Sequence, residues 1–90
     1  MAQSYKLYTG QLTALGATPT PLAGAEAFSI REVVIQSAPS NTTNVLVGHA
    51  TNQFLGLVPG QGLSIPLNNI SSIYVKMASG TGTVNWLARD

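Results

Sequence analysis

Few side chains in this 90-residue chain could take part in catalysis or bind a metal. His49 is the single histidine, and the three carboxylates are Glu26, Glu32 and Asp90. A metal triad or a Ser-His-Asp arrangement would have to use Asp90 at the chain end, where fraying is common. A glycosidase would need Glu26 and Glu32 to face each other across a cleft with substrate-binding aromatics, and we expect exposed charges instead. We therefore predict no enzymatic activity, no metal site and no cofactor.

Two further motifs match binding or modification sites only in part. The glycines at 56, 60 and 62 lack the lysine and the following helix of a phosphate loop, so they predict a turn. Residues 41–43 and 69–71 match the N-glycosylation triplet. However, the N-terminus MAQSYKLYTG has no signal-peptide core, and no apolar run approaches membrane-spanning length. We expect a protein that is made in a cytoplasm and stays folded as made.

The charge content is low and limits the possible partners. Charged residues make up 8% of the chain, against about 25% in an ordinary soluble domain. The four cationic residues are dispersed and the formal net charge is +1, which disfavours nucleic acid and anionic membranes as partners. Cysteine is absent, so packing or partners must stabilise the fold. Such a surface is typical of a subunit that is partly covered in a larger assembly.

The chain length allows one domain with one thin core. We expect residues 1–27 to form an N-terminal strand and extended segment, and residues 28–90 to form the main domain, the two making one structural unit. Short β-branched and aromatic runs alternate with turn residues every eight to twelve positions, and no window has helical periodicity. This pattern predicts an all-β fold, a single antiparallel β-sandwich of about seven to eight short strands.

The central element is expected at residues 28–48. Two β-branched runs, 30–35 and 45–47, flank a turn cluster, which predicts an antiparallel hairpin closed by the Asn41 and Asn44 side chains. The apolar alternation changes phase near Arg31, where we expect a bulge or a bend.

Other expected elements follow in chain order. They are a first strand at 5–13, a mostly extended connection at 14–27, strands at 54–58 and 63–67 joined by a turn, a turn at 68–72 with Ile70 inward in a 3-10 helix, and strands at 73–77 and 83–87. Pro66 suits an edge strand. In the strand at 73–77, residues 73, 75 and 77 are expected inward and residues 74 and 76 outward.

Residues 34–48 and 74–88 have similar patterns at an offset of 40 positions. They are either a duplicated hairpin or two hairpins with the same turn chemistry, and the second interpretation is favoured.

Five segments together resemble small structural proteins of tailed bacteriophage virions. They are V-V-I-Q-S-A (33–38), N-V-L-V-G (44–48), L-V-P-G-Q-G-L-S-I-P-L (57–67), I-Y-V-K (73–76) and V-N-W-L-A (84–88). The resemblance implies a capsid decoration or cement protein that stabilises the head by binding across capsid subunits. It also implies localisation in the virion, the major capsid protein or another virion protein as partner, and a homotrimer. The alternative is a neck, tail or head-fibre component that acts as a carbohydrate- or receptor-binding module.

Six residues are the predicted interface: Tyr5, Leu7, Tyr8, Leu12, Tyr74 and Trp86. The first four are proposed to anchor the N-terminal segment on a neighbouring subunit or on the capsid shell. The other possibility is that residues 5–13 are the first strand of the domain's own sheet. Tyr74 and Trp86 either lie in the core or an interface or, in the carbohydrate alternative, form a sugar-stacking platform whose Trp fluorescence a saccharide would quench.

Overall fold

The alternation of apolar and polar residues produces strands that each have one buried face. The computed structural model describes residues 7–23 and 29–89, with the side chain of Phe54 excepted. Within these ranges the elements are β1 (Leu7–Leu15), β2 (Thr20–Pro21), β3 (Glu32–Ser37), β4 (Val45–His49), β5 (Asn52–Leu57), β6 (Gly62–Pro66), the 3-10 helix η1 (Ile70–Ser72), β7 (Tyr74–Met77) and β8 (Gly82–Arg89). None of the helices within the described ranges is long and apolar enough to span a membrane.

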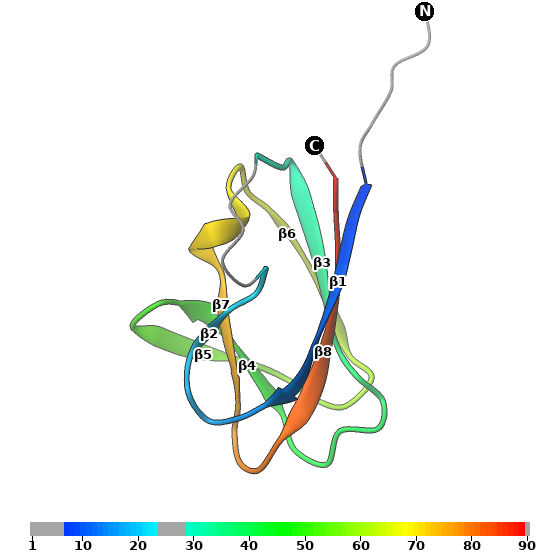
Figure 1. Ribbon diagram of the computed structural model, residues 1–90, viewed down its shortest axis with the longest axis vertical. Coiled ribbons are helices and arrows are strands. Elements are labelled where there is room, and N and C mark those ends of the chain that lie inside the picture. Colours follow the sequence, from blue (N-terminus) through cyan, green and yellow to red (C-terminus); the bar gives the residue numbers. More distant parts are fainter. Residues whose placement is uncertain (1–6, 24–28, 90) are drawn as a thin grey trace, which may run out of the picture.

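The strands form two four-stranded antiparallel sheets that pack face to face (Figure 1). Sheet A has the strand order β1-β8-β3-β6, and sheet B has the order β2-β7-β4-β5. The all-β sandwich predicted from the sequence is confirmed. Pro66 lies in β6, an edge strand of sheet A, where its missing N–H leaves no central ladder bond unmade.

The core lies between the two sheets and is built from the inward-facing residues of both. In and beside β7, Ile73, Val75 and Met77 are buried while Tyr74 and Lys76 are only half-buried, as predicted. Ile70 is fully buried in η1, also as predicted. The Asn69 side chain caps this 3-10 turn by accepting a hydrogen bond of 3.0 Å from the Ser71 backbone N–H.

The hairpin predicted at residues 28–48 is wrong. β3 pairs with β6 and β8 in sheet A, whereas β4 pairs with β5 and β7 in sheet B. The connecting turn therefore crosses from one sheet to the other. A hairpin would have placed the apolar faces of β3 and β4 side by side in one sheet, where neither could cover the other. The crossing places them opposite each other, so that each buries the other.

The Asn41 side chain holds this crossing turn against β8. Its Nδ2 donates to the backbone oxygen of Thr83 at 2.8 Å and to Ser37 Oγ at 3.0 Å, and its Oδ1 accepts from the Thr83 N–H at 2.8 Å. The sequence predicted side-chain hydrogen bonds from Asn41 to backbone, and those to Thr83 reach the neighbouring strand. Two polar backbone groups of β8 are thereby satisfied by one side chain.

The phase change predicted near Arg31 is a bend. Ile30 is buried, the chain bends at Arg31, and β3 begins at Glu32. Backbone hydrogen bonds tie the bend to the ends of both neighbouring strands, with Arg31 N–H donating to the Arg89 oxygen at 2.7 Å and Leu67 N–H donating to the Arg31 oxygen at 3.2 Å. Phe28, where the predicted hairpin began, lies outside the described residues.

The eight strands divide into two halves with matching topology. If each strand is replaced by the one four places away in the chain, so that β1 becomes β5 and β8 becomes β4, the order of sheet A becomes β5-β4-β7-β2. This is the order of sheet B read from its other edge. The crossing turns also match, since Ala38 N–H donates to the Thr83 oxygen at 3.1 Å and Ala78 N–H to the Asn44 oxygen at 2.9 Å. The similarity of residues 34–48 and 74–88 thus reflects two equivalent crossings between sheets, and the interpretation as two hairpins is wrong.

The described part of the N-terminal segment contributes a strand to each sheet. β1 pairs with β8 from Leu7 to Leu12, and its register shifts before Leu15, where Ala14 has a φ of 54°. β2 pairs with β7, and Leu22 just after it is fully buried. Residues 7–13 therefore form a strand of the domain's own sheet.

Candidate functional site

The predicted interface residues of β1 point to opposite faces of sheet A. Leu7 lies on the outer face and is 68% exposed. Tyr8 and Leu12 lie on the inner face, where they are partly buried against the core. Tyr5 lies outside the described residues. Leu7 therefore faces away from Tyr8 and Leu12, and contact of these residues with a neighbouring subunit stays a prediction.

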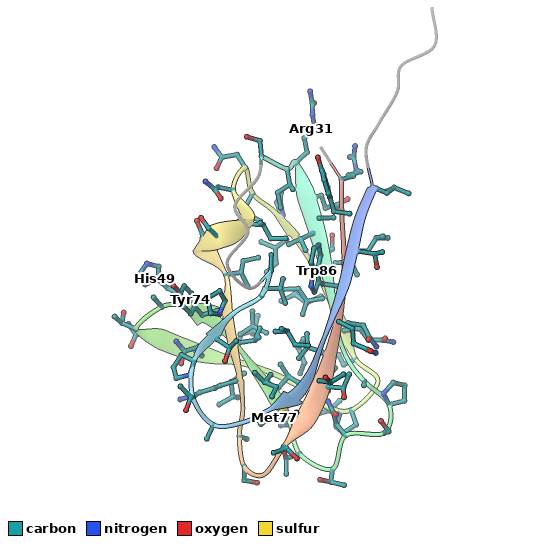
Figure 2. All side chains as sticks on the ribbon, in the orientation of Figure 1. Arg31, His49, Tyr74, Met77 and Trp86 are labelled. Atoms are coloured by element: carbon teal, nitrogen blue, oxygen red, sulfur yellow. The ribbon has the colours of Figure 1, made fainter. Side chains whose placement is uncertain are left out.

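The two predicted aromatic residues lie on different sheets. Trp86 is in β8 of sheet A and packs against the core, whereas Tyr74 is in β7 of sheet B (Figure 2). The structure does not bring these rings together into a shared stacking platform. His49 lies at the end of β4 in sheet B, whereas Glu32 lies in β3 of sheet A. Within the described ranges, no group of three His, Cys, Asp or Glu residues could hold a metal.

The outer face of sheet A carries a row of residues across its four strands, here called the apolar row because its two central members are Leu87 and Val34. The strand register places Thr9 beside Leu87, Leu87 beside Val34, and Val34 beside Ser64. Leu87 is 45% and Val34 is 40% exposed, although both occupy central strands. Neither was predicted as a site residue. The signal was available in the consecutive apolar residues 33–35 and 86–88, because alternation along a strand turns the middle residue of such a run outward when its neighbours are in the core.

A row of amide side chains lies on one side of the apolar row. Gln11 Nε2 donates to Asn85 Oδ1 at 2.7 Å, and Asn85 Nδ2 donates to Gln36 Oε1 at 3.3 Å. These bonds connect β1, β8 and β3 in order. The amide row holds its donors and acceptors in fixed positions beside an apolar strip, which suits recognition of another protein's backbone or polar side chains.

The other side of the apolar row carries the one ion pair recorded among the described residues. Arg89 Nε lies 3.6 Å from Glu32 Oε1, and Ser64 Oγ donates to Glu32 Oε2 at 2.7 Å. Both charged side chains are well exposed, so we assign the pair little stabilising energy. Its charges cancel locally, which leaves the outer face of sheet A nearly neutral.

The outer face of sheet A is hollowed only slightly. One open depression of about 320 Å³ is lined mainly by Val34, Gln36, Asn85 and Leu87, and a second extends past Leu7 toward the ion pair. Both are shallow and partly apolar. This shape and chemistry fit the flat surface of another protein better than an enclosed small molecule.

Gly10 is needed because the Trp86 ring lies over it. A Cβ at position 10 would lie 2.6 Å from the indole atoms Cε2, Cζ2 and Nε1. We expect Gly10→Ala to lower the free energy of unfolding by about 1 to 2 kcal/mol, since the ring would have to leave its packed position. Urea melts read by Trp86 fluorescence would measure the loss.

Gly16→Ala is the matched control for this substitution. No atom lies within 4 Å of the Cβ position at Gly16, so its unfolding free energy should change by less than about 0.5 kcal/mol. Equal losses in the two variants would contradict the proposed role of Trp86.

A search for similar proteins found a structural neighbour. No family model matches the chain, and no curated protein matches it by sequence. Among solved structures, the SPBc2 prophage-derived protein YomS is similar over 100% of this chain and 98% of its own, with a TM-score of 0.59 and 16% sequence identity. The chain shares the fold of YomS.

Proposed function

We propose that this protein is a non-enzymatic structural subunit of a bacteriophage particle. The observation that carries the proposal is the end-to-end fold similarity to a prophage-derived protein of nearly the same length. The resemblance of the strand and turn segments to small virion proteins points the same way. Within that class we propose a capsid decoration or cement role, and a neck, tail or head-fibre position is the alternative.

The proposed mechanism is adhesion through the outer face of sheet A. Burial of its apolar row against another virion protein would contribute about 25 cal/mol per Å² of apolar surface removed from water. The amide row beside it would fix orientation, because each amide must find a hydrogen-bond partner once water is excluded. Few ions would lose their hydration on contact, because the one ion pair recorded on this face is Glu32–Arg89.

Mass spectrometry of purified phage particles tests the proposal directly. We expect the chain to copurify with particles at a constant copy number. Copies on the order of hundreds would support a capsid decoration protein, and a count matching one ring of subunits would support the neck or tail. If particles produced by cells that express the chain do not contain it, a structural role in the virion would be refuted.

Leu87→Lys should detach the protein from the particle. We expect occupancy to fall at least tenfold, because a lysine would replace apolar contact surface with a charge that must lose its hydration when the face is covered. Leu55→Lys is the matched control, since Leu55 is 52% exposed but belongs to β5 of sheet B. It should change occupancy by less than about twofold, and thermal melts should show both variants folded.

The same binding assay separates apolar from ionic attachment. Raising NaCl to about 1 M should release little wild-type protein, whereas denaturant should release it, because few ion pairs exist to be screened. Release by salt alone, or equal losses for the two lysine variants, would contradict adhesion through the outer face of sheet A.

A further inference from the structure

The outer edge of β1 is the least protected edge of the sandwich. Among the described residues β1 pairs only with β8, and no described strand lies along its other side. β1 has nine residues, the most of any edge strand, with neither proline nor charge. By contrast, β2 has two residues, β6 ends at Pro66 and β5 has six residues. Long uncharged edges are templates for pairing with another strand.

We propose that β1 pairs with β1 of a second copy of this chain. The two strands run antiparallel about a twofold axis at Gly10, and they join the two A sheets into one eight-stranded sheet. This contact uses the edge of sheet A and leaves Val34 and Leu87 on its outer face open. It therefore goes beyond the proposed function and does not depend on it.

The alternation of side chains selects the register. In an antiparallel pair, residues that lie directly opposite each other are on the same face of the sheet. Two copies of β1 related by a twofold axis can therefore extend sheet A only if the axis passes between one residue and the same residue of the second copy. An axis at Gly10 opposes Tyr8 to Leu12 of the second copy and Thr9 to Gln11. Axes at Thr9 or Gln11 would instead oppose Tyr8 or Leu12 to the glycine. Of these three axes, only the one at Gly10 opposes Tyr8 to Leu12 and Thr9 to Gln11, while Leu7 lies opposite Thr13.

The inner face of this pairing would complete the burial of two residues. Tyr8 and Leu12 pack against the core yet remain half-buried, because they belong to the edge strand. Each would be covered by the other across the axis. An aromatic residue opposite an aliphatic one on the same face stabilises strand pairing, and the twofold axis would make this contact twice.

On the outer face, the amide row would continue into the second copy. Gln11 already donates from Nε2 to Asn85, which leaves one amide hydrogen and the side-chain oxygen available under the capacity of a primary amide. Thr9 donates its hydroxyl to the Trp86 backbone oxygen at 3.1 Å, so its lone pairs can accept. Gln11 of one copy can therefore donate to Thr9 of the other, at both symmetric positions.

Gly10 at the axis would bring the two Trp86 rings near each other. Each indole covers the inner side of its own Gly10. Paired residues on neighbouring strands lie about 4.5 to 5.5 Å apart. Since the chain has one tryptophan, pairing should change the environment of a single fluorophore.

Sedimentation of the full chain tests the pairing. At tens of micromolar we expect a species of twice the 9.4 kDa chain mass, with a Trp86 emission shift that follows dimerisation on a dilution series. A monomer throughout that range would overturn the proposal. A homotrimer, as the virion resemblance implied, would also overturn it.

Cysteine mixing tests the register in a chain that has no native cysteine. Under mild oxidation, an equimolar mixture of Thr9→Cys and Gln11→Cys proteins should give at least tenfold more disulfide-linked dimer than either protein alone. Thr81→Cys, on an exposed turn residue, is the control partner and should not cross-link with either. Equal cross-linking of Thr9→Cys with itself would overturn the axis at Gly10.

A charge pair tests the same contact without oxidation. In the double variant Thr9→Lys with Gln11→Lys, each lysine at position 9 faces a lysine at position 11 of the second copy. This repulsion should raise the dimer dissociation constant at least tenfold. Thr9→Lys with Gln11→Glu opposes unlike charges and should bring it back to within threefold of the wild type. Equal dissociation constants for the two variants would overturn the proposal, provided circular dichroism shows both folded.

Discussion

Deletion of residues 2–13 is expected to abolish the cooperative thermal melt of this protein. The deletion removes the six residues of β1 that pair in regular register with β8. It also removes Tyr8 and Leu12 from the inner face and the backbone beneath the Trp86 ring. A domain of this size has a total stability of only about 5 to 15 kcal/mol, so losing one strand of four in a sheet should leave it unfolded.

The control for this deletion is removal of residues 2–6 alone, which keeps all of β1. We expect that variant to melt cooperatively within a few degrees of the wild type, as measured by circular dichroism. A cooperative, near-normal melt after deletion of residues 2–13 would contradict the role of β1 in the fold. It would favour the hypothesis that this segment serves only as an anchor on a neighbour.

Asn41→Ala should lower the free energy of unfolding more than any other single substitution of a polar residue proposed above. It leaves the Thr83 N–H without its side-chain acceptor and removes both donations from Nδ2. Leaving a partly buried donor unsatisfied costs about 1 to 3 kcal/mol, and loss of the other bonds adds to this. We expect a total loss of roughly 2 to 3 kcal/mol and a Tm lower by roughly 10 to 20 °C.

Two further variants make the Asn41 prediction specific. Asn41→Asp keeps an oxygen that can accept from the Thr83 N–H, but its second carboxylate oxygen faces the Thr83 backbone oxygen and cannot donate, so most of the stability loss of Asn41→Ala should remain. Thr42→Ala alters an exposed neighbour in the same turn and should change stability by less than about 0.5 kcal/mol. A loss of similar size for Thr42→Ala would mean that the turn is sensitive to any substitution.

Local patterns predicted the elements of this fold well. Strand positions, the inward faces of β7, the 3-10 turn at Ile70 and the bend at Arg31 all follow from alternation and turn chemistry. These features depend on a few consecutive residues, so the chain itself carries the information. Leu87 and Val34 belong to the same class, because consecutive apolar residues in a strand must place one of them outward.

Tertiary structure alone decided which strands pair and which residues share a surface. The turn at residues 38–44 has the composition of a hairpin turn, yet it carries the chain from sheet A to sheet B. Turn residues set where the chain reverses, but the choice between pairing beside a strand and crossing over it depends on which apolar faces can bury each other. For the same reason, the sequence by itself determined a low-charge β-sandwich with exposed apolar residues. Only the packing of the strands placed Val34 beside Leu87 in sheet A and put Tyr74 and Trp86 in different sheets.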